Sequence, residues 1–243
     1  MATYRLDLAY DGAGFRGWAT QPGLRTVQGE LEDALGRVLG EPVRLTVAGR
    51  TDAGVHALEQ VASWSSERRP PDGLERALNA LTGPDLAVLG ITIAPGFDAR
   101  RDARSRRYRY RIETGTPPSP FERGRALHWP HRLHRAALDE CAALLAGTHD
   151  FTAFTPTETD HVRFERDVLA AGWEEEREGI LTFEIEADAF LRSMVRALVG
   201  TMLEVGGGGR DVDGFRRLLA GAPRSDAGPT APPEGLYLVA VRY

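Results

Sequence analysis

Apolar and polar residues alternate in several short stretches of the chain, and each of these stretches predicts a β-strand. The first is TYRLDLAYDG, residues 3–12, where the alternation stops at an Asp-Gly pair that is typical of a turn. The same type of pattern recurs further along the chain. It predicts strands at residues 43–48, 60–64, 86–94, 107–112, 167–175, 180–187 and 235–243.

Apolar residues at helical spacing predict helices between these strands. In residues 27–39 the repeat follows Thr26, a good N-terminal cap. Further helices are predicted at residues 72–82, 135–147 and 190–205, and a short one follows the glycine run GGGG. Because strands and helices are mixed in both halves, the sequence predicts an α+β fold with two similar subdomains, residues 1–104 and 105–243, built on mixed or antiparallel sheets. An ancient duplication and a chance similarity of two α+β halves both fit this pattern.

The composition is that of a soluble globular protein. Of the 243 residues, 42% are hydrophobic and 27% are charged, and no apolar run approaches the roughly 20 residues that span a bilayer. The polar start of the chain has no apolar segment of the kind found in signal peptides. The one cysteine, Cys141, excludes an internal disulfide. We therefore expect a cytoplasmic protein without a membrane segment.

The charge is unevenly distributed. The net charge of −5 argues against non-specific coating of nucleic acid, yet all 30 basic residues are arginines and seven of them lie between Arg100 and Arg111. A strand in this region would point its arginines and its tyrosines to opposite faces. Two interpretations stay open: a solvated charged face, or an RNA groove in which arginines hold phosphates and a tyrosine stacks on a base.

Three histidines in the stretch HWPHRLH, namely His128, His131 and His134, are spaced like metal ligands. However, Pro130 interrupts any helix that would align them, and no carboxylate or thiol lies at ligand spacing nearby. We expect no metal site here. The glycine run lacks the Gly-Lys-Ser/Thr ending of a phosphate-binding loop and predicts a flexible connector.

The stretch TVAGRTDAGVHA, residues 46–57, places Asp52 between two glycines directly after a predicted strand. A surface turn uses the same residue types, so a plain turn is one interpretation. The other is a reactive carboxylate held out on a loop. Arg196 lies in an apolar helix, where a buried guanidinium needs a carboxylate partner, and Asp52 is a candidate.

Taken together, five ordered blocks resemble the tRNA pseudouridine synthase A family. The blocks are RTVQGELEDAL, AGRTDAGVHA, GFDARRDARSRRYRYRI, EADAFLRSMVRALVGTMLEVG and APPEGLYLVAVRY. The resemblance implies a pseudouridine synthase fold with two similar halves flanking a basic cleft. It also implies a homodimer acting on tRNA, with uridines 38, 39 and 40 of the anticodon stem-loop as targets.

The resemblance also assigns roles to residues. Asp52 matches the nucleophile, and Tyr108 matches the tyrosine that stacks on the target base. Arg196 would pair with the aspartate, Arg50 would help to hold the base out of the stack, and Leu238 would line the pocket. From the arginine cluster, we expect Arg104, Arg106 and Arg107 to contact the RNA backbone.

The reaction implied by this family needs no cofactor. The N1–C1′ bond of uridine breaks, the base turns, and ribose rejoins the base at C5, so nothing is oxidised and no group leaves. A carboxylate nucleophile suffices if the site orients the base. Three routes stay open: attack at C6, attack at C1′ and a glycal route. Two rival functions are a catalytically inactive RNA-binding protein on the same scaffold and a hydrolase with a carboxylate nucleophile.

Overall fold

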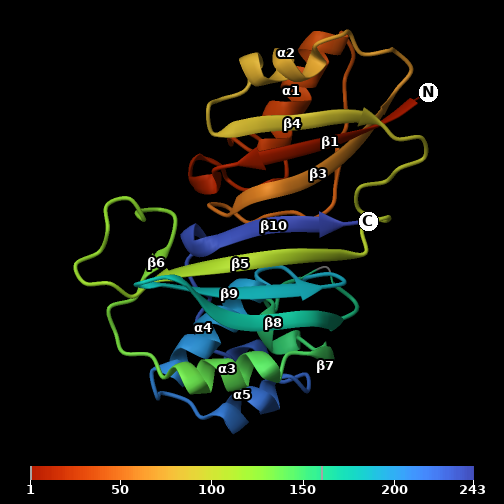
Figure 1. The fold of residues 1–243 in the computed structure, drawn as a ribbon. Helices are drawn as coiled ribbons and strands as arrows, with labels where there is room; N and C mark the ends of the chain where they lie inside the picture. Colours follow the sequence, from red (N-terminus) through yellow and green to blue (C-terminus); the bar gives the residue numbers. More distant parts are fainter. Residues whose placement is uncertain (1, 160) are drawn as a thin grey trace. The chain divides into compact units, whose positions relative to one another are not determined.

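The structure, a computed structural model, describes residues 2–159 and 161–243 and divides into two compact units. The first unit holds the chain up to Arg104 together with Tyr237–Tyr243, and the second holds Ser105–Leu236 (Figure 1). The sequence predicts that residues 237–243 belong to the second half. In the structure these residues group with the first unit, where Tyr237 and Leu238 pair in parallel with His56 and Ala57, a long-range pairing that chain order does not reveal.

The first unit is a sheet in the order β4-β1-β3-β10, with β2 paired to β3. The central strand β1 runs antiparallel to both of its neighbours, whereas β10 runs parallel to β3. Helix α2 contacts both α1 and β4. The elements are β1 (Ala2–Tyr10), η1 (Gly12–Gly14), α1 (Val27–Leu39), β2 (Thr46–Val47), β3 (His56–Ser66), α2 (Leu74–Leu81), β4 (Leu86–Ile93) and β10 (Leu236–Arg242).

The ends of helix α1 follow from its sequence. The side chain of Thr26 accepts a hydrogen bond from the Gly29 amide at 3.3 Å, as a helix N-cap does. At the other end Gly40 adopts the left-handed conformation with φ +67°, which stops the helix. Leu31 and Leu35 on its inner face are fully buried. The predicted helix is therefore confirmed at both ends.

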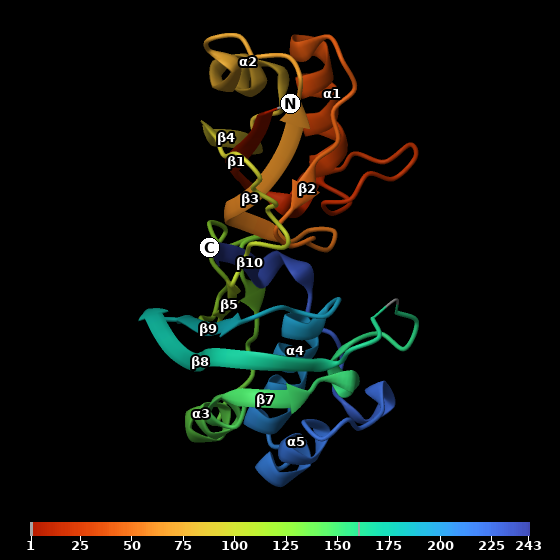
Figure 2. The ribbon, with the colours of Figure 1, turned by 90° about the vertical axis from the view of Figure 1, so that its right-hand side faces the viewer.

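The second unit is a sheet in the order β5-β9-β8-β7, with β6 paired in parallel to β5. Helix α3 contacts β8 and α4, and α4 contacts β5, so these helices cover the sheet (Figure 2). The elements are β5 (Ser105–Glu113), β6 (Leu127–His128), α3 (Arg135–Ala143), β7 (Gly147–Asp150), η2 (Thr152–Phe154), β8 (Glu165–Arg177), β9 (Ile180–Ala187), α4 (Met194–Gly206), α5 (Val212–Leu218), η3 (Arg224–Asp226) and η4 (Pro233–Gly235).

Helix α4 begins later than the sequence predicts. The apolar repeat predicts a helix from residue 190, but α4 starts at Met194, after Ser193 adopts a left-handed conformation with φ 57°. Arg192 therefore lies before the helix, where its guanidinium donates to the Glu158 carbonyl at 2.8 Å. Arg192, which falls inside the predicted helix, is thus separated from the helical Arg196 by the non-helical residue Ser193.

Both units combine helices with a sheet that is mostly antiparallel and contains one parallel pair. This confirms the predicted α+β class. None of the helices in the described part of the chain has the length and apolar character needed to cross a membrane. Within the same residues, no group of three or more His, Cys, Asp or Glu side chains is arranged to hold a metal ion.

Candidate active site

The loop that carries Asp52 joins β2 to β3 and is closed by a turn. The amide of Val55 donates to the Asp52 carbonyl at 3.2 Å, and Gly54 between them has φ +80°. Residues with a side chain rarely adopt that backbone conformation, so glycine suits this position. Gly54, the second of the two glycines that flank Asp52, is therefore explained by the turn itself.

A second segment, residues 12–18, forms backbone hydrogen bonds with this loop. The amide of Trp18 donates to the Thr51 carbonyl at 3.0 Å, and the amide of Gly54 donates to the Phe15 carbonyl at 3.3 Å. The two backbones also touch near Gly12, because a Cβ atom there would lie 2.0 Å from the Val55 carbonyl oxygen. Only glycine fits at this contact.

The three residues in the middle of the loop differ in exposure. Arg50 is exposed, Thr51 is buried with 7% of its surface accessible, and Asp52 is intermediate. The Thr51 side chain therefore anchors the loop, while the two residues that flank it remain accessible. This is the arrangement expected if Arg50 and Asp52 act on a ligand.

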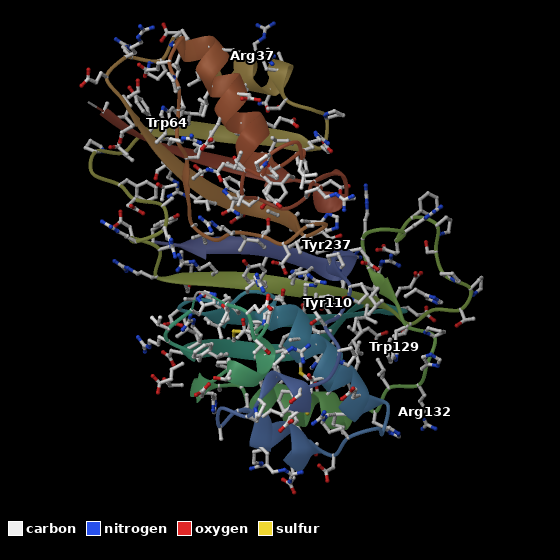
Figure 3. The ribbon with its side chains drawn as sticks, turned by 180° about the vertical axis from the view of Figure 1, so that it is seen from behind. Arg37, Trp64, Tyr110, Trp129, Arg132 and Tyr237 are labelled. Atoms are coloured by element: carbon white, nitrogen blue, oxygen red, sulfur yellow. The ribbon has the colours of Figure 1, made fainter. Side chains whose placement is uncertain are left out.

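The strand β10 brings Leu238 to the same part of the first unit. Leu238 is fully buried and lies in parallel register with Ala57, five residues after Asp52. Its neighbour Tyr237, near the start of β10 (Figure 3), stacks on His56 with ring centroids 4.6 Å apart. His56 in turn accepts a hydrogen bond from the Gly12 amide at 3.1 Å through Nδ1. His56, the first residue of β3 after the Asp52 loop, is thus held from two sides.

Tyr108 lies in the second unit, on β5. It is buried, sits opposite Ile185 of β9, and makes an edge-to-face contact with Phe190 at 4.9 Å between ring centroids. The predicted alternation of β5 is confirmed, since Tyr108, Tyr110 and Ile112 are buried while the arginines between them are partly exposed.

The arginine face of β5 is occupied mainly by ion pairs. Arg109 lies 2.6 Å from Glu184, and Arg111 lies 2.5 Å from Glu122 and 3.0 Å from Glu176. Arg107 is less tightly held, with its guanidinium 4.0 Å from Glu184. Part of this face therefore fits the first of the two interpretations of this strand, a charged face with a structural role.

The three arginines expected to meet the RNA backbone have different surroundings. Arg104 is exposed and belongs to the first unit, where its amide donates to the Arg242 carbonyl at 2.8 Å. Arg107 is partly exposed in the second unit. Arg106 is buried and donates to the Asp188 carbonyl at 2.9 Å, so its guanidinium is the least accessible of the three.

Arg196 lies in the first turn of α4 and supports a neighbouring segment. Its Nε donates to the Ala231 carbonyl at 2.8 Å, while the Ala231 amide donates to the Arg196 carbonyl at 3.0 Å. Gly200, one turn later, is required here because a Cβ atom would lie 1.8 Å from the Pro229 carbonyl oxygen. The side chain is thus oriented by its own unit.

The predicted site residues fall into two groups. The first unit carries Asp52, Arg50, Leu238 and Arg104, and the second carries Tyr108, Arg196, Arg106 and Arg107. Within the first unit, the structure brings the Asp52 loop and Leu238 to one pair of strands. The pairing of Asp52 with Arg196 stays a prediction.

Sequence reasoning missed the side chains that anchor the loop. The hydroxyl of Tyr10 lies 2.8 Å from the hydroxyl of Thr51, and the Gln60 amide group donates to the Gly49 carbonyl at 2.8 Å. The one available signal was a polar glutamine at the start of an otherwise apolar strand. Such a residue, when buried, needs hydrogen-bond partners.

Comparisons with known proteins are consistent with this geometry. A family model described as tRNA pseudouridine synthase matches residues 8–98 and 141–243. A protein of Frankia casuarinae named tRNA pseudouridine synthase A is 47% identical over 244 residues, which cover 98% of this chain and 88% of that protein. A protein of the same name from Chloroflexus aurantiacus is 44% identical over 248 residues, covering 100% and 89%.

Among solved structures, a chain from "Crystal Structure of a Cbf5-Nop10-Gar1 Complex" has a TM-score of 0.36 at 10% identity. The match covers 97% of this chain and spans 58% of that one. The assignment rests instead on the family model, which matches more than half of the chain, and on relatives that align with it almost from end to end. The chain belongs to the tRNA pseudouridine synthase family.

Proposed function

We propose that this protein converts uridines 38, 39 and 40 of the tRNA anticodon stem-loop to pseudouridine, with Asp52 as the nucleophile. Membership of the family establishes the coarser statement, that the protein is an isomerase that forms pseudouridine in tRNA. The target positions and the residue roles are the proposal. A cytoplasmic location goes with it, because tRNA is the substrate.

The observation that carries the proposal is the way in which backbone hydrogen bonds hold the loop of Asp52. Its loop has no regular secondary structure, yet backbone hydrogen bonds from Trp18 and to Phe15 fix it on both sides of the aspartate. A carboxylate that is partly accessible and held in a fixed direction is suited to attack a bound base or ribose. A surface turn would not need this support.

In the proposed reaction Asp52 adds to the nucleotide, at C6 of the base or at C1′ of the ribose, or it assists a glycal route. The N1–C1′ bond breaks, the base turns, and a C5–C1′ bond forms while the hydrogen at C5 leaves as a proton. N1 takes up a proton, and any bond that formed to Asp52 breaks and frees the carboxylate, so atoms and electrons balance without an oxidant, a reductant or a group donor. The enzyme has to bind the extruded nucleotide and exclude water.

The other residues take roles around this step. Tyr108, with its ring fixed by Phe190, would stack on the flipped base, and Leu238 would form the apolar wall next to β3. Arg196 would pair with the aspartate, since a carboxylate in a site with little water needs a cation nearby. Arg50, exposed on the loop, would hold the base out of its stack.

Tritium release tests the function. Unmodified tRNA that contains [5-³H]uridine should lose tritium to water when incubated with the protein, because only C5–C1′ bond formation frees that hydrogen. Transcripts that carry cytidine at position 38, 39 or 40 should each release correspondingly less. A silent RNA-binding protein or a hydrolase would release none, and release that persists without all three uridines would refute the positions.

The same proposal includes a homodimer. The family resemblance covers both units, and it implies that one tRNA can contact two subunits. Light scattering of the active protein should therefore give the mass of two chains. A monomer at the assay concentration with full activity would contradict this part of the proposal alone.

A further inference from the structure

We propose that Tyr10 and Gln60 are positioning residues of the enzyme. Together with Thr51 they form a chain of hydrogen bonds inside the first unit, and this chain sets the orientation of the loop that carries Asp52. The inference rests on the proposed function, because it explains how the nucleophile is held.

The chain starts at the Gln60 side chain, whose orientation is fixed by its partners. The Val61 amide donates to Oε1 of Gln60 at 3.1 Å, so that atom is the carbonyl oxygen. The other end, Nε2, then donates to the Gly49 carbonyl at 2.8 Å and to the Tyr10 hydroxyl oxygen at 3.3 Å. A reversed amide would place two acceptors against each other at Gly49.

The chain continues through Tyr10. Its side chain is buried, and burial raises the pKa of the phenol to about 12, so the hydroxyl keeps its proton at neutral pH. The oxygen already accepts from Gln60. Among the described residues, the Thr51 hydroxyl lies 2.8 Å from it, and either hydroxyl can donate in this bond. The hydrogen bonds therefore link Gln60, Tyr10 and Thr51.

These bonds hold the residue directly before Arg50 and the residue directly before Asp52. Gln60 fixes the carbonyl of Gly49, just before Arg50, and Tyr10 fixes the side chain of Thr51, just before Asp52. The carbonyl of Thr51 is held as well, by the Trp18 amide at 3.0 Å. Thr51 is thus fixed at both its side chain and its backbone, which limits the directions open to Asp52.

An irregularity of strand pairing makes this chain possible. On β3, Gln60 lies opposite Leu8, while Ala57 lies opposite Tyr10, so β3 contains one extra residue between the two pairs. Residues three apart in a regular strand point to opposite faces of the sheet. The bulge turns both Ala57 and Gln60 to the buried face, where Gln60 meets Tyr10.

A network of this kind also stabilises the fold, and the test must separate the two roles. The variant Tyr10→Phe keeps the ring and removes the hydroxyl, and Thr51→Val removes the Thr51 hydroxyl while Thr51→Ser keeps it. The matched control is Tyr4→Phe, because Tyr4 is a buried tyrosine on the same face of β1 that stacks on Trp64. Three quantities are measured: the single-turnover rate of tritium release, the Kd for tRNA at fixed salt, and amide hydrogen exchange of residues 49–55.

We expect Tyr10→Phe and Thr51→Val to slow single turnover about ten- to a hundredfold, since a small misplacement of a reacting group has effects of this size. The Kd should stay within about twofold, because most contacts to nucleic acid are to phosphates. Exchange should become faster in residues 49–55 and not elsewhere. Thr51→Ser should remain close to the wild type, and the double variant Tyr10→Phe/Thr51→Val should be no slower than the slower single variant, because both break the same bond.

Three results would overturn the inference. One is a Tyr10→Phe variant that matches Tyr4→Phe in both rate and exchange. Another is faster exchange throughout the first unit, which indicates general destabilisation, and the third is a double variant whose losses multiply. Wild-type protein that releases no tritium would contradict the proposed function instead, since the exchange measurement needs no tRNA and still reports on the network.

Discussion

The Asp52 loop of the first unit and the strand β5 of the second hold their proposed site residues by different means. The loop is irregular and is held by hydrogen bonds with Trp18, Tyr10 and Gln60, all of which lie outside the loop. In β5, ladder pairing with β9 fixes Tyr108 opposite Ile185. A loop therefore needs specific tertiary contacts to place a reacting group, whereas a strand places one through its register.

The two regions also treat charge differently. On β5 each arginine beyond Arg107 has a close carboxylate, as in the pair Arg109–Glu184 at 2.6 Å. Arg50, on the loop, is exposed. The arginine-rich strand is thus in part a structural surface. The candidates for contact with RNA narrow to Arg107, whose ion pair is the longest on this face, and to the exposed Arg104, which precedes the strand.

The largest effect should come from the loop. Replacing its carboxylate by an amide of the same shape, Asp52→Asn, should abolish tritium release, a loss of at least about 10⁴-fold if the carboxylate is the nucleophile. The fold and the affinity for tRNA should persist, because the loop is held by groups other than this side chain. Single-turnover assays and filter binding measure the two quantities.

The control for this substitution is Asp33→Asn, at an exposed position on α1. It should behave as the wild type. Near-normal turnover by Asp52→Asn would show that Asp52 is not the nucleophile, and the loop would then be only a turn held by hydrogen bonds.

The next effect concerns Tyr108. Tyr108→Leu loses the aromatic face, and base stacking is worth roughly 1–3 kcal/mol, so single turnover should slow by about ten- to a hundredfold. Tyr108→Phe keeps the face and should be mildly impaired if the residue only stacks. If the hydroxyl also moves the C5 proton, the Phe variant should stall after glycosidic cleavage with near-normal affinity. Equal and near-wild-type rates for both variants would exclude Tyr108 from the active site.

A smaller effect is expected at the far end of β5, where Glu122 joins the Arg111 guanidinium at 2.5 Å and Arg177 at 2.6 Å. Burial alone would raise the Glu122 pKa, but the hydrogen bonds and charges of the two arginines outweigh it and hold the pKa below the usual 4.5. The carboxylate thus contributes stability above pH 4.5 that is lost as the pH falls through the lowered pKa.

Glu122→Gln should accordingly lower the free energy of unfolding by about 1–3 kcal/mol at pH 7. The difference from wild type should shrink as the pH is lowered past 4.5. Denaturant unfolding at several pH values measures it, with Glu178→Gln, at an exposed position beside β8, as the control. A difference that does not change with pH would show that charge is not the cause.

The smallest effect should be on salt dependence. If Arg104 and Arg107 contact phosphates, replacing each by Gln should flatten the log–log salt dependence of tRNA binding by somewhat less than one unit. Arg106→Gln should change stability more than the slope, because Arg106 is buried against the Asp188 carbonyl. Arg37→Gln on α1 (Figure 3) is the control. An unchanged slope for the Arg104 and Arg107 variants would place the RNA elsewhere.

Much of the local structure could be predicted because it depends on neighbours in sequence. The Thr26 cap and the apolar repeat determine α1, and the Arg-Tyr alternation determines the two faces of β5. Each of these features is set by the period of a helix or a strand, or by a backbone conformation that few residues adopt. The position of Asp52 between two glycines after a strand left both a plain turn and a reactive carboxylate open, and its assignment as the candidate nucleophile came from the resemblance to the family.

The support of that site was decided only by tertiary structure. The sequence does not show that β10 joins the first unit and brings Leu238 beside β3, since a parallel pair can join strands separated by most of the chain. Nor does it show the bulge that turns Gln60 toward Tyr10, because a single extra residue reverses the face that a strand position would otherwise take. Those contacts depend on which distant backbones come together, and local periodicity carries no information about that.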